Sequence, residues 1–269
     1  MNSDSVQTLR EASPYIYQHR GRTFVITFPG EVVEHGNFRR ILQDIAIVSA
    51  LGSRIVLVHG TRTQINQRLA QAGRVSRFHH NVRVTTAEDI PLVEEAVGCL
   101  RIRIEKLLSH ALHQSSFIGK NINVCSGNYL TAQPLGVIDG VDYAYSGKIR
   151  RIDTTAIQQQ LDTHSIVLVS PLGYSPSGEA YNLDYEQVTL ALAKELPHTD
   201  KIILLNTNPL TLPRELVAAD ISQDANTPAF LQRTAQLLSH SGGERVHLLD
   251  ANQDGALLLE LYTRNGVGT

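Results

Sequence analysis

The stretch Thr23-Phe24-Val25-Ile26-Thr27-Phe28-Pro29-Gly30-Glu31 decides the fold. Its first six residues are apolar or β-branched, which is typical of a strand buried on both faces. Its last three form a turn at the carboxyl end of that strand, where a phosphate site could stand. The strand carries no lysine, Pro29 has no N–H to donate, and Glu31 adds a negative charge. Because transferring phosphoryl groups are held by cations and backbone N–H groups, the stretch argues against ATP-driven phosphoryl transfer and indicates a sensor.

The rest of the chain alternates short apolar strands with amphipathic helices. Strands are expected over 55–58, 165–169, 201–205 and 245–249, and helices over 36–51, 63–72, 153–161, 184–196, 227–239 and 255–262. A helix capped by Thr86, with Asp89 three residues on, is followed by a further one that extends to about His113. This order predicts an α/β fold with a mostly parallel sheet covered on both faces. The turn-rich residues 123–153 predict a small β insertion.

Composition limits the partners and the compartment. A net charge of -2 gives no reason to expect nucleic acid or an anionic membrane as the main partner. Cys99 and Cys125 are interpreted as two small core residues in a reducing cytosol, since two cysteines make no disulfide framework. The N-terminus lacks the build of a signal peptide, and no apolar run approaches the ~20 residues of a membrane span. We expect a soluble, cytoplasmic protein.

Residues 1–20 form a separate N-terminal arm. Leu9 and the run Pro14-Tyr15-Ile16-Tyr17 indicate a short amphipathic helix placed before the first strand. Such an arm either packs on another subunit or folds back on its own domain, and the sequence leaves the two alternatives even. Residues 21–269 are expected to be one domain.

Polar motifs follow the strands in a characteristic order. They include Pro29-Gly30, His59-Gly60-Thr61-Arg62, Asn81-Val82-Arg83, Ser170-Pro171-Leu172-Gly173, Tyr181-Asn182-Leu183-Asp184 and the closing run 259–269. The series resembles the amino-acid kinase family over nearly the whole chain. Within that family, 126–153 and Arg10-Glu11-Ala12-Ser13-Pro14-Tyr15-Ile16 resemble the kinase-like N-terminal domain of bacterial N-acetylglutamate synthase more than N-acetylglutamate kinase. The resemblance implies a three-layer αβα sandwich of the amino-acid kinase type.

The chain departs from the kinases at the positions that grip phosphate. The lysine of the first strand is replaced by Thr27, and the late lysine by a lysine-free run, 227–243. The glycine-rich turn has become Gly60-Thr61-Arg62-Thr63, and Asn206-Thr207-Asn208 replaces an aspartate turn. This pattern fits a degenerate kinase fold with no catalytic residue, as in the synthase.

In the synthase family, acetyl transfer from acetyl-CoA belongs to a C-terminal acetyltransferase domain. The run Arg264-Asn265-Gly266-Val267-Gly268 lacks the glycine spacing of an acetyl-CoA loop. We therefore expect a domain without an acetyltransferase site and without a cofactor of its own.

The resemblance implies an arginine site at Tyr15, His247, Glu260 and Gly266. A carboxylate such as Glu260 can pair with a guanidinium, turn N–H groups near Gly266 can meet a carboxylate, and Tyr15 can cover the aliphatic stem. Composition alone favours a plainer interpretation, a solvated Glu260 and a satisfied strand-end His247; the resemblance reverses that preference.

Gly30, Gly60, Arg83 and Asn182 match the substrate site of the kinases. Their retention is vestigial or structural, and residual binding of an acylamino acid is a weaker alternative. His110 and His113 have helical spacing but no third ligand, so no metal is expected.

Three hypotheses stay open. The first is an arginine-sensing domain of N-acetylglutamate synthase that also forms a homo-oligomer through its N-terminal helix. The second is a working N-acetylglutamate kinase with unusual phosphate ligands, and the third is a purely structural oligomerisation module.

Overall fold

The computed structural model describes residues 3–111, 122–207, 231–232, 235 and 246–269. The expected first strand is β1 (Thr23–Phe28), whose six residues are all buried. It lies inside a six-stranded sheet with the order β14-β13-β1-β2-β10-β5, in which every pair of neighbours is parallel. The other strands are β2 (Arg54–His59), β5 (Val124–Ser126), β10 (Ile166–Val169), β13 (Thr199–Asn206) and β14 (Val246–Asp250).

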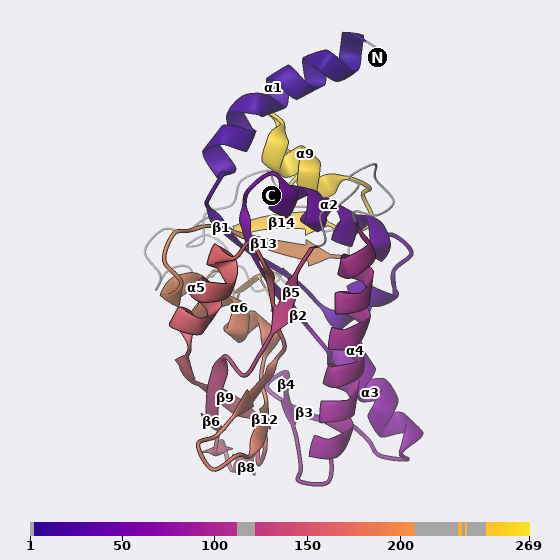
Figure 1. The fold of residues 1–269 in the computed structure, drawn as a ribbon. Coiled ribbons are helices and arrows are strands. Elements are labelled where there is room, and N and C mark those ends of the chain that lie inside the picture. Colours follow the sequence, from indigo (N-terminus) through magenta and orange to yellow (C-terminus); the bar gives the residue numbers. More distant parts are fainter. Residues whose placement is uncertain (1–2, 112–121, 208–230, 233–234, 236–245) are drawn as a thin grey trace.

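Helices cover both faces of this sheet (Figure 1). Side chains alternate along β1, so that Phe24, Ile26 and Phe28 enter one hydrophobic cluster and Val25 enters the other. The first cluster includes residues of α2 (Phe38–Ala50), α4 (Ile90–Ala111) and α9 (Ala256–Tyr262). The second includes residues of α5 (Thr154–Asp162) and α6 (Tyr185–Glu195). The expected three-layer αβα architecture is confirmed.

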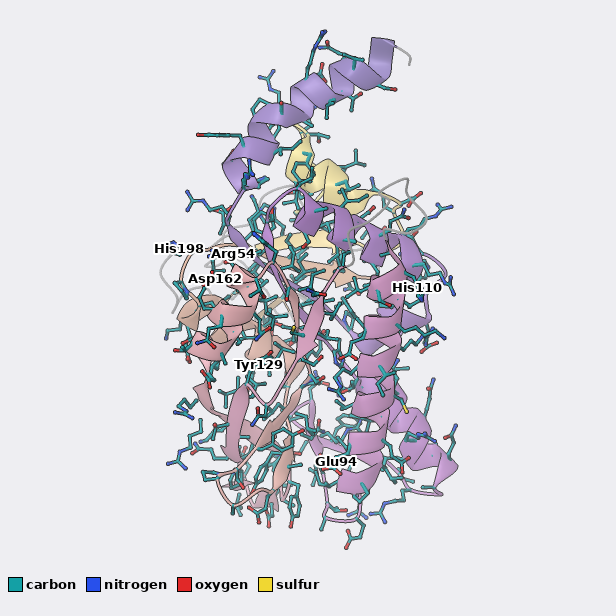
Figure 2. The ribbon with its side chains drawn as sticks, in the orientation of Figure 1. Arg54, Glu94, His110, Tyr129, Asp162 and His198 are labelled. Carbon is teal, nitrogen blue, oxygen red and sulfur yellow. The ribbon has the colours of Figure 1, made fainter. Side chains whose placement is uncertain are left out.

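One ion pair and one N-cap hydrogen bond hold the two ends of α5 (Thr154–Asp162). Arg54, the first residue of β2, forms a 2.9 Å ion pair with Asp162, the last residue of α5 (Figure 2). Helix α5 begins at a side-chain cap, since Asp153 accepts the N–H of Ala156 at 3.0 Å. The cap and the pair fix both ends of the helix.

The first strand predicted for the β insertion belongs to the central sheet instead. Val124–Ser126 is β5, the edge of the central sheet, because it pairs in parallel with β10. A second sheet has the order β12-β11-β6-β9, from β6 (Leu130–Pro134), β9 (Gly147–Ile152), β11 (Leu172–Tyr174) and β12 (Ala180–Asn182). Two hairpins stand beside it: β3 (Arg77–His79) with β4 (Val82–Val84), and β7 (Val137–Ile138) with β8 (Val141–Asp142).

The helix that was expected in two pieces is a single one. Asp89 accepts the N–H of Thr86 at 3.1 Å, which is half of a capping box, but the regular helix α4 begins only at Ile90. It then runs without a break through Gly98 to Ala111. His113 and most of the helix expected over 227–239 lie outside the described residues.

The expectation of two core cysteines is wrong. Cys99 is exposed on α4 and Cys125 is half-buried on the edge strand β5; both are free thiols. The shorter connections are the 3₁₀ helix η1 (Gly30–Glu34) and α3 (Arg62–Gln71). No helix of the described residues is long and apolar enough to cross a membrane.

The arm is α1 (Ser3–His19), and its two halves behave differently. Ala12, Tyr15 and Ile16 pack against the hydrophobic cluster that holds α9. The first half projects away from the body (Figure 1). Of the two alternatives for the arm, folding back is therefore observed for its second half.

Candidate functional site

The turns after β1 and β2 meet at the carboxyl ends of the sheet. Gly60 donates its N–H to the carbonyl of Phe28 at 2.7 Å. A Cβ on Gly60 would lie 3.0 Å from the backbone of Pro29 and Gly30 and 3.1 Å from the ring of Tyr185. Gly60 is therefore required for the close approach of the two turns, whether or not a phosphate ever lies there.

Protein groups occupy the surroundings of these turns. Thr27, which the resemblance matches to a lysine of the kinases, is fully buried, and its hydroxyl has no hydrogen-bond partner among the described residues. Gln64 donates its side-chain N–H to the carbonyl of Gly30 at 2.9 Å. Burial raises the pKa of Tyr185, packed beside Gly60, well above its usual range. Strand β1 therefore supplies no cation to a phosphate at these turns.

Arg83 and Asn182 line one cavity of about 270 Å³ beside these turns. The Arg83 guanidinium is buried and donates to Ser76 Oγ at 2.6 Å and Asn66 Oδ1 at 2.7 Å. Burial, and then the neighbouring Arg62, lower its pKa to about 10, so Arg83 is a cation at neutral pH. Arg62 and Arg83 both lie over the ring of Phe78, at 4.2 and 4.7 Å from its centroid.

Asn182 belongs to a polar network that joins the small sheet to the β3–β4 hairpin. Its side-chain N–H donates to Thr85 Oγ1 at 3.1 Å, and Ser146 Oγ lies 2.9 Å from the same hydroxyl. Ser146 Oγ also donates to the carbonyl of Arg83 at 2.5 Å. Arg83 and Asn182 therefore have structural partners, and the cavity that they share presents a cation beside apolar walls.

A second group of polar residues lies at the opposite edge of the sheet. Strands β13 and β14 begin at this edge, and α9 packs over it, so His247 near the start of β14 faces Glu260 near the end of α9. The two side chains are only 16% and 11% exposed. The structure thus brings together two of the residues implied for the arginine site.

The Glu260 carboxylate receives three hydrogen bonds. His247 Nδ1 donates to Oε1 at 2.6 Å, and the N–H groups of Val267 and Gly268 donate to Oε2, both at 2.8 Å. These donors, the His247 side chain first, lower the pKa of Glu260 to about 2, although burial opposes them. Glu260 is therefore a half-enclosed, permanent negative charge and not a solvated helix residue.

Lys201 is a site residue that the sequence analysis missed. Its Nζ lies 3.3 Å from His247 Nε2. Because an ammonium group only donates, His247 must accept at Nε2 and carry its proton at Nδ1, where it meets Glu260. Register explains the contact: Ile203 pairs with His247, and Lys201, two residues before, points to the same face.

The other two implied residues lie on α1 and just after α9. Tyr15 is half-buried against the cluster that holds α9, and Gly266 follows α9 with a φ of +54°. A Cβ on Gly266 would collide with the Glu260 carboxylate, so a larger residue there would displace that carboxylate from its present position. His19, at the end of α1, ties the arm to α9 through its Nε2, 2.9 Å from the carbonyl of Leu261.

Among the residues the structure describes, no cluster of three His, Cys, Asp or Glu side chains could hold a metal ion. His113 lies outside those residues, so the zinc pair that was considered with His110 is not described.

The αβα fold, with turns after β1 and β2 that receive no cation from β1, defines the class of protein. The model of the Amino acid kinase family matches residues 22–209, and the chain belongs to that family. Isopentenyl phosphate kinase shares the fold, with a TM-score of 0.56 at 13% identity over 89% of this chain and 96% of that one.

The relatives with higher sequence identity are longer proteins, and their names give an acetyltransferase or a synthase instead of a kinase. The chain is 45% identical over 277 residues to the amino-acid acetyltransferases of Pseudomonas aeruginosa PAO1 and Azotobacter vinelandii, which covers 99% of this chain and 64% of theirs. N-acetylglutamate synthase from Neisseria gonorrhoeae, complexed with coenzyme A and L-arginine, superimposes with a TM-score of 0.88 at 35% identity. That match covers 97% of this chain and 63% of the solved one, so this chain spans somewhat under two thirds of these relatives.

Proposed function

We propose that this chain is the arginine-sensing regulatory domain of an N-acetylglutamate synthase, the enzyme that joins acetyl-CoA and L-glutamate in the first step of arginine biosynthesis. On this proposal the chain has neither a kinase nor an acetyltransferase site of its own. The observation that carries the proposal is the Glu260 carboxylate, which is half-enclosed. Hydrogen bonds from His247, Val267 and Gly268 keep it ionised.

The chemistry of the group suits L-arginine. A guanidinium is planar and pairs with a carboxylate through parallel hydrogen bonds, and Glu260 retains a free lone pair on Oε1. Lys201 supplies a positive charge nearby for the α-carboxylate, and Tyr15 supplies an aromatic surface for the aliphatic stem. That the gonococcal synthase was solved with L-arginine supports this assignment.

The contacts around Gly30 and Gly60 favour sensing over phosphoryl transfer. Gln64 and Tyr185 fill space beside the two turns, and the strand position where the kinases carry a lysine holds the buried Thr27. No observation favours the alternative of a functional N-acetylglutamate kinase. For Arg83 and Asn182 we propose a structural role, supported by their hydrogen bonds to Ser76 and Thr85.

Assembly through the arm is the second part of the proposal. Leu9 and Tyr17 on α1 are 64% and 86% exposed, although both are apolar or aromatic. Exposed apolar side chains on a projecting helix are typical of a contact with another copy of the chain. We place the protein in the cytoplasm, where the two free thiols would stay reduced.

Calorimetry and thermal unfolding with L-arginine test the sensing role. Arginine should raise the melting temperature of the chain, because a ligand that binds only the folded state stabilises it, by about 2.7 kcal/mol at a hundred times Kd. Glu260→Gln should abolish the rise. Glu94→Gln, an exposed glutamate on α4 (Figure 2), is the matched control and should keep it. No heat and no shift at millimolar arginine would remove the proposal.

A further inference from the structure

A second cavity lies between the start of α2 and the second half of α4. It has a volume of about 360 Å³, and the two helices that border it lie side by side (Figure 1). It shares no lining residue with the cavity at Arg83, and it does not include the group around Glu260. Four nitrogen-bearing side chains line it: His35, Arg39, Arg103 and Lys106.

The described charges around this cavity do not cancel. Arg39, Arg103 and Lys106 each carry one positive charge, and only Glu34 forms an ion pair with any of them within the described part of the chain, at 2.8 Å from Arg103. Three positive charges and one negative charge leave a net charge of +2. Arg103 and Lys106 are also three residues apart on α4, so they share one face of the helix and repel each other. Such local conflicts are expected at functional sites.

Two of the donors are held in place before any ligand arrives. Arg103 donates to Glu34 Oε1 at 2.8 Å and to the carbonyl of Val33 at 3.2 Å, which uses two of the five N–H donors of its guanidinium. The Nδ1 atom of His35 accepts the N–H of Asn37 at 3.2 Å. The proton of His35 is therefore on Nε2, which makes that nitrogen a donor.

We propose that this cavity binds the dianion of a phosphate monoester. A phosphate group carries a charge of about −1.5 to −2 at neutral pH and offers three acceptor oxygens, which matches the net charge and the donors of the cavity. Guanidinium groups pair with phosphate through parallel hydrogen bonds, and an ammonium group such as that of Lys106 acts as a point charge. The first turn of α2 lines the cavity too, so the positive end of its helix dipole adds to the attraction.

The cavity has room for more than the phosphate group. Its volume of about 360 Å³ falls within the range of about 300 to 1,000 Å³ that is typical of small-molecule sites. Val33 and Phe38 in its lining are 1% and 2% exposed, and Leu107 is partly buried against the same hydrophobic cluster. The wall behind the cations is therefore apolar, which favours an ester with a small organic body over free phosphate.

Calorimetry with phenyl phosphate, inorganic phosphate and benzoate tests the proposal on the unchanged chain. The ionic strength is kept constant with potassium chloride, because salt screens exposed charges. Phenyl phosphate should bind saturably and at least about threefold more tightly than inorganic phosphate, because its ring covers apolar surface. Benzoate has the same ring but only one negative charge, so it should bind at least about tenfold more weakly than phenyl phosphate.

Each of these comparisons can fail. No saturable heat with millimolar phenyl phosphate would overturn the site. Benzoate that binds as tightly as phenyl phosphate would overturn the match to a dianion, and inorganic phosphate that binds as tightly would overturn the ester.

Two neighbouring arginines on α2 provide a matched test of the location. Arg39 lines the cavity, whereas Arg40 lies outside it and pairs with Asp254 at 2.6 Å. Arg39→Gln and Lys106→Gln should each weaken the binding of phenyl phosphate about tenfold, because each removes a charged donor, and Arg40→Gln should change it less than about twofold. Arg39→Lys keeps the charge and should retain most of the affinity. Both replaced side chains are exposed, so the melting temperature should stay close to that of the parent chain.

The cavity at Arg83 provides the competing outcome. Arg62, which lies 4.2 Å from the centroid of the Phe78 ring, is a cation of that other cavity. Loss of phenyl phosphate binding in Arg62→Gln, with unchanged binding in Arg39→Gln and Lys106→Gln, would overturn the proposal. The inference does not depend on arginine sensing, because binding of L-arginine is measured separately and neither result decides the other.

Discussion

At the scale of residues, Glu260 shows how a protein keeps a carboxylate ionised away from water. Burial alone would raise its pKa, yet three donors reverse the effect. The charge is thus prepared before any cationic ligand arrives, which lowers the cost of binding one.

The pH dependence of stability should show this charge. The pKa of Glu260 falls from an ordinary 4.5 to about 2 in the folded chain, so its contribution is complete above pH 4.5 and is lost as the pH falls toward 2. Denaturant unfolding of Glu260→Gln at pH 7 should show a loss of about 2 to 3 kcal/mol, and the difference from the parent should shrink at pH 3. A difference that does not change between pH 7 and pH 3 would contradict the assignment.

Asp44 on α2 makes the opposite prediction. Burial, and then the charge of Asp254, raise the pKa of Asp44 to about 6 from an ordinary 3.8, so the ionised form costs stability, and the cost is complete above pH 6. Asp44→Asn should stabilise the chain by about 1 to 3 kcal/mol at pH 8 and by little at pH 3.5. Urea unfolding at the two pH values measures this, with Glu94→Gln, a substitution on the exposed side of α4, as the control variant.

Residue types alone predicted the lack of a cation on the first strand but did not predict that Lys201 belongs to the second group of polar residues. That the first strand carries no lysine can be read directly from the sequence. The structure adds that Thr27 is fully buried. Lys201 was missed because a lysine at the start of a strand looks like an ordinary solvated residue. Only the register of β13 against β14 brings it to His247, and register is a property of paired strands.

At the scale of elements, two glycines with different surroundings provide a matched test. A Cβ on Gly60 would press on the backbone of Pro29 and Gly30, whereas a Cβ on Gly98 in α4 would meet nothing within 4 Å. Gly60→Ala should cost about 1 to 3 kcal/mol through overpacking, and Gly98→Ala should add about 0.5 to 1 kcal/mol through helix propensity. Thermal unfolding compares them, and a harmless Gly60→Ala would show that the two turns need no close contact.

The arm allows a second test at this scale. Deletion of residues 1–10 removes the projecting half of α1 and leaves Tyr15 and Ile16 in place, so the melting temperature should hardly change. Deletion of residues 1–16 also removes the packed side chains and should lower it by about 5 to 10 °C. Light scattering then reports assembly: the 1–10 deletion should have a smaller mass than the parent, and an unchanged mass would exclude the projecting half as the contact.

Most elements could be predicted from periodicity because the central strands are apolar throughout and their helices carry one apolar stripe. Elements with weaker patterns were placed less well. Val124–Ser126 is a short edge strand with only partly buried residues, so its sequence does not separate it from the turns that follow. The helix expected in two pieces is the continuous α4, whose first half packs in one hydrophobic cluster and whose second half packs in another.

At the scale of the whole molecule, the sheet separates two candidate sites. The turns after β1 and β2 lie at its carboxyl edge, and Lys201, His247 and Glu260 lie at its amino edge with α1 and α9. The general rule for α/β sheets points to the carboxyl edge, where the cavity is. The amino-edge site could not be found by that rule; it entered through the resemblance of Tyr15, His247, Glu260 and Gly266 to a known arginine site.

The separation predicts that nucleotide and arginine behave independently. Magnesium ATP at millimolar concentration should leave the melting temperature unchanged and should not phosphorylate N-acetylglutamate, since the turns at Gly30 and Gly60 hold no cation from β1 and contact each other directly. Arginine should raise the melting temperature whether or not ATP is present.

Thr27→Lys should not create kinase turnover. The position is fully buried, so the ammonium group would be desolvated without a partner and the folded chain would lose about 3 kcal/mol or more of stability. Phosphate transfer by the parent chain, abolished by Arg83→Ala, would instead restore the kinase alternative.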